Sequence, residues 1–320
     1  MCLHMIKLKS HEQLVLLAST STRSILDSSI KTASGNGWKI VDWKHPFTEK
    51  EEEQFSCDFT PFESASTGKT ANMCVHTFRD IVSGAIRRGK RWNDCNILPS
   101  LWNASMPDEN SIYVEIGTNI GSCAMEMLLG TNASIIAFEP HPMNVFNLKK
   151  TVSGMDPSYQ DRIKLIPIGL GDVQSAPTIF AANNNMGNSV VGTIIKDGGS
   201  QQFGEKFQFT INVERLDSIL STQNLDIKLV KMDAQGYECK IMEGMGSEVA
   251  NSIDVVKFEW ASKWLCGQNC TDLIPRFHNY GFDVYRNFSP GKGEYGGPQD
   301  KSKVDFGSSI QDLFATRKKN

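Results

Sequence analysis

The chain has 320 residues, of which 40% are hydrophobic and 22% are charged. Its 33 basic and 36 acidic residues give a formal net charge of −3, which argues against a general nucleic-acid or anionic-membrane binder, because such proteins carry a basic excess. The composition excludes wholesale disorder, and no apolar run approaches the ~20 residues that cross a bilayer. We therefore expect a soluble, enzyme-sized chain without a transmembrane segment.

The first hundred residues are weakly patterned. Residues 19–34 are rich in Ser and Thr, and residues 49–53 form a short charged run. Residues 67–70 superficially resemble a phosphate loop, but Glu63 occupies the place of its first glycine. His76 also lies in this segment, and we expect it to be an ordinary packed residue. Residues 1–105 are thus predicted to form a partly ordered N-terminal extension.

From about residue 110, short β-branched runs alternate with helical patterns, which is typical of βα units and a parallel sheet. Between the third and fourth of these strands lies an insertion. It contains two expected strands, at 178–181 and 207–211, on either side of a loop rich in Asn and Gly. Two last strands, at 282–285 and 313–316, have no helix between them and must run antiparallel. The five βα strands are expected at 111–115, 134–138, 163–166, 227–232 and 254–258. The sequence therefore predicts an α/β fold with a doubly wound seven-stranded sheet and a terminal antiparallel pair.

A glycine turn follows the first expected strand. Gly117 and Gly121 flank the start of a helix, where glycines let a ligand approach the backbone and free N–H groups are available. Glu139 ends the second strand, from which an acid can accept hydrogen bonds from both ribose hydroxyls. A nicotinamide fingerprint would need glycine at Asn119, and Glu115 would repel a pyrophosphate but suits a cationic ligand such as S-adenosylmethionine. The turn therefore favours that cofactor over a nicotinamide.

Several ordered motifs over about residues 111–285 resemble the FkbM family of S-adenosylmethionine-dependent methyltransferases. The resemblance implies a class I (Rossmann-like) methyltransferase fold, with residues 106–320 as the FkbM-type domain. The motifs that carry it are residues 115–121, 137–142, 170–172, 186–189, 215–217 and 231–238. Together with the turn, they predict cofactor contacts from Glu115, Gly117, Thr118, Asn119, Gly121, Glu139, Pro140 and Asp172.

Three carboxylates are candidates for catalysis. An alcohol acceptor must lose its proton, so a general base is expected, and Asp233 at the end of the fourth strand is the leading candidate. Glu238 is expected to position substrate or to cap a helix, and Glu259 ends the fifth strand near the same cleft. Asp233 has an alternative role as an N-cap. Gln235 replaces a family carboxylate, which argues against a divalent metal, so no metal is predicted.

The resemblance implies O-methylation of a hydroxyl, and we expect a carbohydrate or glycoconjugate acceptor and no nucleic-acid partner. An N- or carboxyl-methyltransferase on the same fold, a silent cofactor-binding protein and a NAD-dependent oxidoreductase are the alternatives. The near-neutral charge fits an uncharged polyol better than a nucleic acid.

Eight cysteines leave the compartment open. Cys57, Cys74 and Cys95 could pair if the protein were exported, whereas Cys123 and Cys239 fall in helical patterns and are expected to be core residues. Four sequons allow export too, and they start at Asn103, Asn132, Asn269 and Asn287. Without a recognisable targeting segment, a cytoplasmic location is favoured over the secretory lumen.

Overall fold

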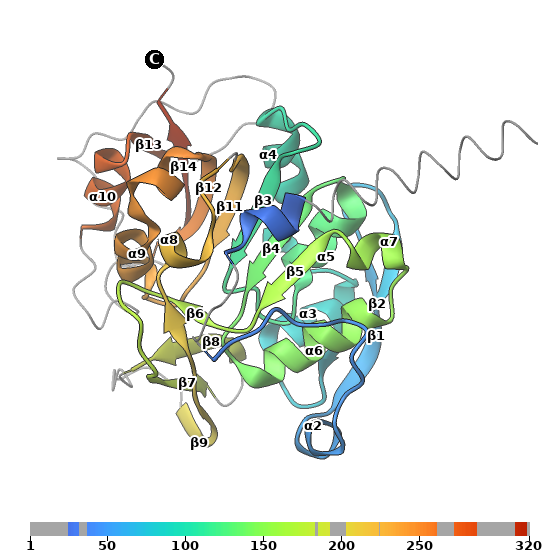
Figure 1. Cartoon of the computed structure of the whole chain (residues 1–320). Helices are drawn as coiled ribbons and strands as arrows, with labels where there is room; N and C mark the ends of the chain where they lie inside the picture. Colours follow the sequence, from blue (N-terminus) through green and yellow to red (C-terminus); the bar gives the residue numbers. More distant parts are fainter. Residues whose placement is uncertain are drawn as a thin grey trace, which may run out of the picture.

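A seven-stranded sheet organises the protein in the computed structural model, which describes residues 25–31, 37–182, 185–192, 203–223, 225–260, 272–286 and 311–318 (Figure 1). The strand order is β13-β14-β12-β11-β3-β4-β5. The strands span β3 (Ile112–Ile116), β4 (Ser134–Phe138), β5 (Ile163–Ile166), β11 (Ile227–Met232), β12 (Ile253–Trp260), β13 (Phe282–Tyr285) and β14 (Gln311–Arg317). Each strand lies within about two residues of its predicted range.

The direction of the strands confirms the predicted topology. The five strands from β5 to β12 run parallel, whereas β14 lies between β12 and β13 and is antiparallel to both. The sheet therefore contains the predicted seven strands and the predicted antiparallel pair.

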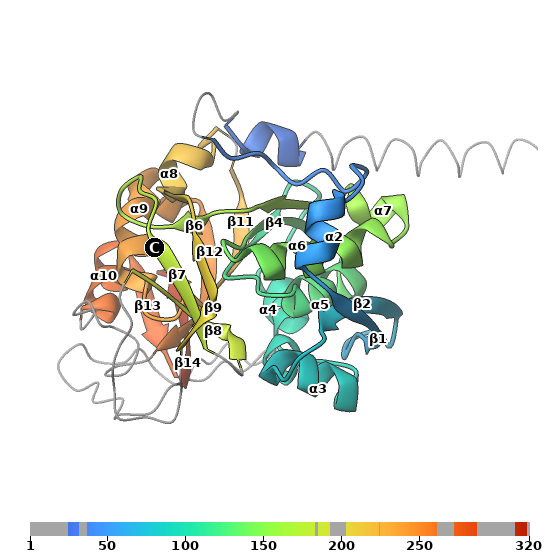
Figure 2. The ribbon, with the colours of Figure 1, turned by 90° about the horizontal axis from the view of Figure 1, so that it is seen from below.

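Helices cover both faces of the sheet (Figures 1 and 2). One hydrophobic cluster joins alternate strand residues such as Val114 and Ile116 to α8 (Leu216–Ile219), α9 (Glu238–Asn251) and α10 (Leu273–Asn279). A second cluster joins residues such as Tyr113 to the helices of the opposite face, α4 (Leu98–Ala104), α5 (Ser122–Gly130) and α6 (Pro142–Ser153). Because successive strand residues point to opposite faces, strands that are apolar throughout supply both clusters.

The insertion forms a second small sheet beside the main one, with the order β8-β7-β9 (Figure 2). The sequence predicted β7 (Thr178–Ala182) and β9 (Phe203–Thr210), and both are present. It did not predict β8 (Asn185–Val191), because Asn and Gly usually indicate a loop. Two short parallel strands, β6 (Gly169–Leu170) and β10 (Val213–Glu214), connect this insertion to the main fold.

The N-terminal region adds elements that the weak sequence pattern did not predict. After α2 (Glu49–Gln54), an antiparallel hairpin of β1 (Cys57–Glu63) and β2 (Thr70–His76) leads to α3 (Ile81–Gly89) and the short η1 (Asn93–Cys95). Side chains from β2, α3 and α4 belong to the second hydrophobic cluster. A short helix, α7 (Pro157–Gln160), follows α6.

The segment that superficially resembled a phosphate loop is the turn of this hairpin. Glu126 on α5 is fully buried and accepts hydrogen bonds from the backbone N–H groups of Ala65 and Ser66 at 2.9 and 3.2 Å. The hydroxyls of Ser64 and Ser66 donate to the same carboxylate at 3.0 and 2.9 Å. The turn is therefore anchored to α5 by a carboxylate whose charge is stabilised by four donors.

Two disulfides connect described cysteines. Cys57 pairs with Cys74 inside the hairpin, and Cys95 pairs with Cys123 at the first turn of α5. The pairing of the first three cysteines was predicted only in part, and Cys123 is more than the core residue that its helical pattern suggested. Cys239 is nearly buried, as expected, but it is disulfide-bonded too. Helical spacing indicates which side chain is buried and not which thiol lies beside it.

Among the described residues, none of the helices has the length and apolar character needed to span a membrane.

Candidate functional site

A pocket of about 320 Å³ lies at the carboxyl edge of the sheet. Its floor comes from the ends of β3, β4 and β11 and from the segment after β5. Its other walls come from α3, η1 and β8, so the N-terminal region and the insertion both close over it. Ligands of open α/β sheets bind at this edge, where neighbouring strand ends diverge.

The glycine turn forms one wall of the pocket and depends on close packing. Gly117 has a φ of +77°, and a Cβ atom there would lie 1.9 Å from the carbonyl oxygen of Asp233. Gly121 has a φ of +88°, and its Cβ would lie 2.3 Å from a methyl group of Leu148. The sequence predicted that both glycines admit a ligand. In the structure Gly117 lines the pocket and Gly121 does not, and the two glycines let β3 and α5 pack against β11 and α6.

Glu139 is held by three donors at the end of β4. Its Oε2 accepts the N–H of Asn119 at 2.7 Å, and its Oε1 accepts the N–H of His141 at 2.9 Å and the Asn144 amide at 3.2 Å. The carboxylate is 4% exposed and lines the pocket. Burial raises its pKa above the usual value, although these hydrogen bonds oppose the shift. Further acceptor capacity is left for hydroxyl groups of a ligand.

Glu115 is a second buried carboxylate in the same wall. It is 1% exposed, and burial raises its pKa to about 7. The Tyr113 hydroxyl donates to Oε2 at 3.1 Å, and Lys231 lies opposite it in the sheet register and lowers this pKa. Burial removes the water that stabilises the ionised carboxylate. A cationic ligand would stabilise the ionised form in place of that water.

These observations fit S-adenosylmethionine. Glu139 would hold the ribose hydroxyls, Glu115 would favour the cationic amino-acid end, and apolar Phe138, Ile168 and Leu170 offer a wall for the base. Gly117, Thr118, Asn119 and Pro140 line the pocket as well. The residues present thus suit a nucleoside with a cationic substituent.

Three predicted residues do not line the pocket, and the first is Gly121, which packs against Leu148. Asp172 does not line the pocket, and its backbone carbonyl accepts a hydrogen bond from Arg215 at 2.7 Å. Glu238 is buried beneath the turn after β11, where its Oε1 accepts the N–H of Ala234 at 2.9 Å. Burial raises the pKa of Glu238 to about 7. Glu238 is the first residue of α9, but this bond anchors the turn that precedes the helix, and α9 has no side-chain cap.

Asp233 and Glu259 meet at the far end of the pocket. The Gln235 amide donates to Asp233 Oδ1 at 2.6 Å and to Glu259 Oε2 at 2.9 Å. Lys231 forms an ion pair with Asp233 at 3.2 Å. Gln235 has a φ of +50°, so its backbone is held in the left-handed region that places its amide between the two carboxylates.

The two carboxylates have opposite pKa shifts. Burial alone would raise the pKa of Asp233, but the Lys231 ammonium and the Gln235 amide hold it below its usual value. Burial and the charges of Asp233 and Glu238 raise the pKa of Glu259 to about 8. A pair whose environments separate the two pKa values is typical of an acid–base site.

Several pocket residues had no sequence signal. Asp94 comes from η1 and Trp92 directly precedes it, whereas Ile81 and Val82 come from the start of α3. Burial and the charge of Asp312 raise the pKa of Asp94. Only the tertiary fold brings these residues to the sheet edge. Lys231, by contrast, lies within a motif and could have been singled out as the partner of Asp233.

The fold and this site define a class I S-adenosylmethionine-dependent methyltransferase. Residues 115–284, more than half of the chain, match the family model of the methyltransferase FkbM domain. The chain belongs to the FkbM family, and S-adenosylmethionine is its cofactor. This family assignment argues against the alternative of a NAD-dependent oxidoreductase.

Solved structures of methyltransferases are similar to the chain at low identity. Methyltransferase FkbM from Methylobacillus flagellatus KT is 14% identical, with a TM-score of 0.38, over 69% of this chain and 51% of that one. The chain thus spans about half the length of that protein. Magnesium protoporphyrin IX methyltransferase from Synechocystis PCC 6803, solved with bound SAM, is 11% identical, with a TM-score of 0.39, over 75% and 86%. No curated protein matches the chain.

Proposed function

We propose that the protein transfers a methyl group from S-adenosylmethionine to a hydroxyl of a carbohydrate or glycoconjugate. The observation that carries this proposal is the pair of Glu259 and Asp233, bridged by Gln235 and with separated pKa values. When bound, the cofactor supplies an electrophilic methyl group on a positively charged sulfur. The chain must then supply a base, since an alcohol is a poor nucleophile until it loses its proton.

Glu259 suits the role of base better than Asp233, which was the leading candidate from sequence. A base is most effective when its pKa lies near the working pH, and the low pKa of Asp233 makes it a weak proton acceptor. Because Oε2 of Glu259 accepts the Gln235 amide, we assign Oε1 as the atom that takes the proton. Asp233 stays ionised and, through Gln235, keeps the carboxyl group of Glu259 in place.

We propose that this step needs no divalent metal. Mg²⁺ and Ca²⁺ prefer oxygen ligands, and a carboxylate at position 235 would have placed a third acid between Asp233 and Glu259. Gln235 instead directs its N–H groups at both carboxylates, which favours proton chemistry over metal binding.

The acceptor end of the pocket favours an uncharged polyol. Trp92 offers an aromatic face, and Asp94 and Glu259 offer oxygens that accept hydrogen bonds from hydroxyls. Nearby carboxylates would repel a carboxylate acceptor or a nucleic-acid phosphate, which disfavours the carboxyl-methylating alternative. A base with a raised pKa also disfavours a silent binding protein.

The proposed reaction is tested by label transfer. The protein is incubated with methyl-labelled S-adenosylmethionine and three sets of acceptors: neutral oligosaccharides, amines and carboxylic acids. We expect alkali-stable label on a hydroxyl of an oligosaccharide. Label found only on nitrogen, or only in an alkali-labile ester, would support the N- or carboxyl-methyltransferase instead.

We further propose that residues 106–320 form the methyltransferase domain and that the preceding segment completes its acceptor side. Ile81, Val82, Trp92 and Asp94 all precede residue 106 and line the pocket. The Cys95–Cys123 disulfide ties this segment to α5 beside the glycine turn.

The disulfides favour an oxidising compartment over the cytoplasm that the sequence favoured, because cytosolic thiols are kept reduced. Of the sequon residues, Asn103 and Asn132 are exposed and so available for glycosylation, while Asn269 and Asn287 lie outside the described residues.

Peptide mapping of unreduced protein tests this inference. We expect peptides linked through Cys57–Cys74 and Cys95–Cys123, whose sequence separations are 17 and 28 residues. Loops of this length imply that each disulfide stabilises the fold by about 3 kcal/mol, so a reductant should lower the urea midpoint. Free thiols at all four positions in protein isolated from its native cells would contradict the inference.

A further inference from the structure

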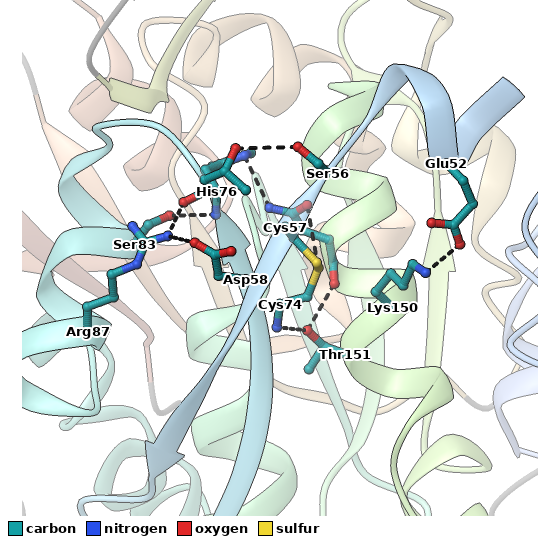
Figure 3. The surroundings of a disulfide bond; sticks show 12 residues. Glu52, Ser56, Cys57, Asp58, Cys74, His76, Ser83, Arg87, Lys150 and Thr151 are labelled. Carbon is teal, nitrogen blue, oxygen red and sulfur yellow. Dashed lines mark hydrogen bonds and ion pairs between the residues drawn. A yellow bond between two sulfur atoms is a disulfide. The ribbon is translucent and has the colours of Figure 1, made fainter.

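The β1–β2 hairpin docks on α6 through a face that carries a disulfide and a histidine (Figure 3). Cys57 lies opposite His76 in the strand register and is bonded to Cys74, two residues earlier on β2. The N–H of Cys74 donates to the Thr151 hydroxyl on α6 at 2.9 Å. Arg87 of α3 donates to the backbone carbonyl of His76. The end of β2 is therefore fixed against α6 from several sides.

The ring of His76 is fully buried, and both of its nitrogens have partners on α6. Nε2 lies 3.0 Å from Asn144 Oδ1, and Nδ1 lies 3.1 Å from Asn147 Nδ2. An amide oxygen only accepts and an amide nitrogen only donates, so these contacts require the neutral ring with its proton on Nε2. Burial, which lowers the pKa of His76, favours the same neutral form.

The His76 proton determines how Asn144 is oriented. Because Nε2–H donates to the amide oxygen of Asn144, the amide nitrogen faces the opposite way and donates to Glu139 Oε1 at 3.2 Å. With the amide reversed, its oxygen would lie against the carboxylate and repel it, and the His76 proton would lack an acceptor. A histidine of the N-terminal hairpin thus holds the carboxylate assigned to the ribose.

We infer that His76 is a positioning residue for cofactor binding, acting through Asn144 on Glu139. A fixed carboxylate binds two ribose hydroxyls with less loss of conformational freedom than one that must first be oriented. This inference rests on the proposed role of Glu139 as the ribose ligand. It assigns to the N-terminal hairpin a part in binding the cofactor, although the hairpin does not line the pocket.

The test compares S-adenosylhomocysteine with its 2′,3′-dideoxy analogue, which lacks the hydroxyls that Glu139 would bind. Dissociation constants are measured by calorimetry for the full chain. For wild type we expect about 100-fold weaker binding of the analogue, from two hydrogen bonds to a charged group. For His76→Leu we expect this ratio to fall to about tenfold, because S-adenosylhomocysteine binds more weakly and the analogue does not.

Three further variants separate positioning from folding. Asn144→Asp keeps the acceptor for His76 but places an acid against Glu139, and we expect the ratio to fall as in His76→Leu. His76→Gln offers a donor and an acceptor in one side chain, so we expect partial rescue. Thr151→Val removes the acceptor for Cys74 on the same helix without touching Glu139, and we expect its ratio to equal that of wild type.

The outcomes are distinguishable. Equal binding of the two ligands by wild type would overturn the ribose assignment of Glu139 and this inference with it. The inference alone would be overturned if the ratio of the two dissociation constants fell to about one in Glu139→Ala but kept its wild-type value in both His76→Leu and Asn144→Asp. If those two variants bound both ligands more weakly by the same factor, the role of His76 would be purely structural, and the inference would again be overturned.

Discussion

Replacing Glu259 by Gln is expected to lower kcat by about 10²–10⁴-fold, the range that a general base contributes. The amide cannot take a proton, yet its oxygen can still accept the hydrogen bond from Gln235, so the local geometry should persist. Binding of S-adenosylhomocysteine should stay within about twofold of wild type. Glu238→Gln is the comparison variant, because Glu238 is a buried acid that does not line the pocket, so the maximal kcat at high pH should stay within about twofold of wild type. Since the charge of Glu238 helps to raise the pKa of Glu259, this variant should reach that maximum at a lower pH.

The pH dependence of kcat gives this prediction a second readout. Burial and neighbouring acids raise the pKa of Glu259 to about 8, so the group is protonated and inactive as a base below that pH. The rate for wild type should therefore rise with pH and level off above about 8, and this rise should be absent in Glu259→Gln. A rate for the variant equal to that of wild type would remove Glu259 from the mechanism and return Asp233 as the candidate.

Replacing Gly117 by Ala should destabilise the fold by about 3 kcal/mol, from a left-handed backbone and an overpacked contact together. The added Cβ would meet the backbone carbonyl of Asp233, an atom that cannot rotate away. Moving it would shift the turn that carries Asp233, so any folded variant should also bind S-adenosylhomocysteine more weakly. Urea unfolding and calorimetry measure the two effects.

Gly68→Ala is the matched control for this substitution. Gly68 has a similar φ of +70°, but a Cβ there would meet nothing within 4 Å. Its expected cost is therefore only the backbone term of about 1 kcal/mol. If the two variants lost the same stability, the close approach of the turn to β11 would have no energetic importance.

The sheet could be predicted because its information is local. Each βα strand is a short apolar run followed by a helical pattern, and the lack of a helix between the last two strands determined their direction. The hairpin of β1 and β2 gave no comparable signal, since Asp58, Thr60 and Asn72 interrupt its apolar pattern. Its stability comes from α5 and α6, which are distant in sequence, and from a disulfide between its own two strands.

The same distinction applies to the site. Glu115 and Glu139 could be placed because strand ends of a parallel sheet share one edge, and both line the pocket. The sequence could not predict which of Asp233 and Glu259 is the better base. Their pKa values depend on Lys231, on Gln235 and on burial in the folded protein. Asp94 and His76 come from a segment whose position against the sheet is purely tertiary.

The most direct test of the account is calorimetric titration of the full chain with S-adenosylhomocysteine, using wild type and Glu139→Ala. We predict one site per chain with a dissociation constant in the micromolar range for wild type, and at least about 100-fold weaker binding for the variant. Equal affinity of the two proteins would remove Glu139 from the site. No binding to wild type at millimolar concentration would contradict the assignment of this pocket to the cofactor.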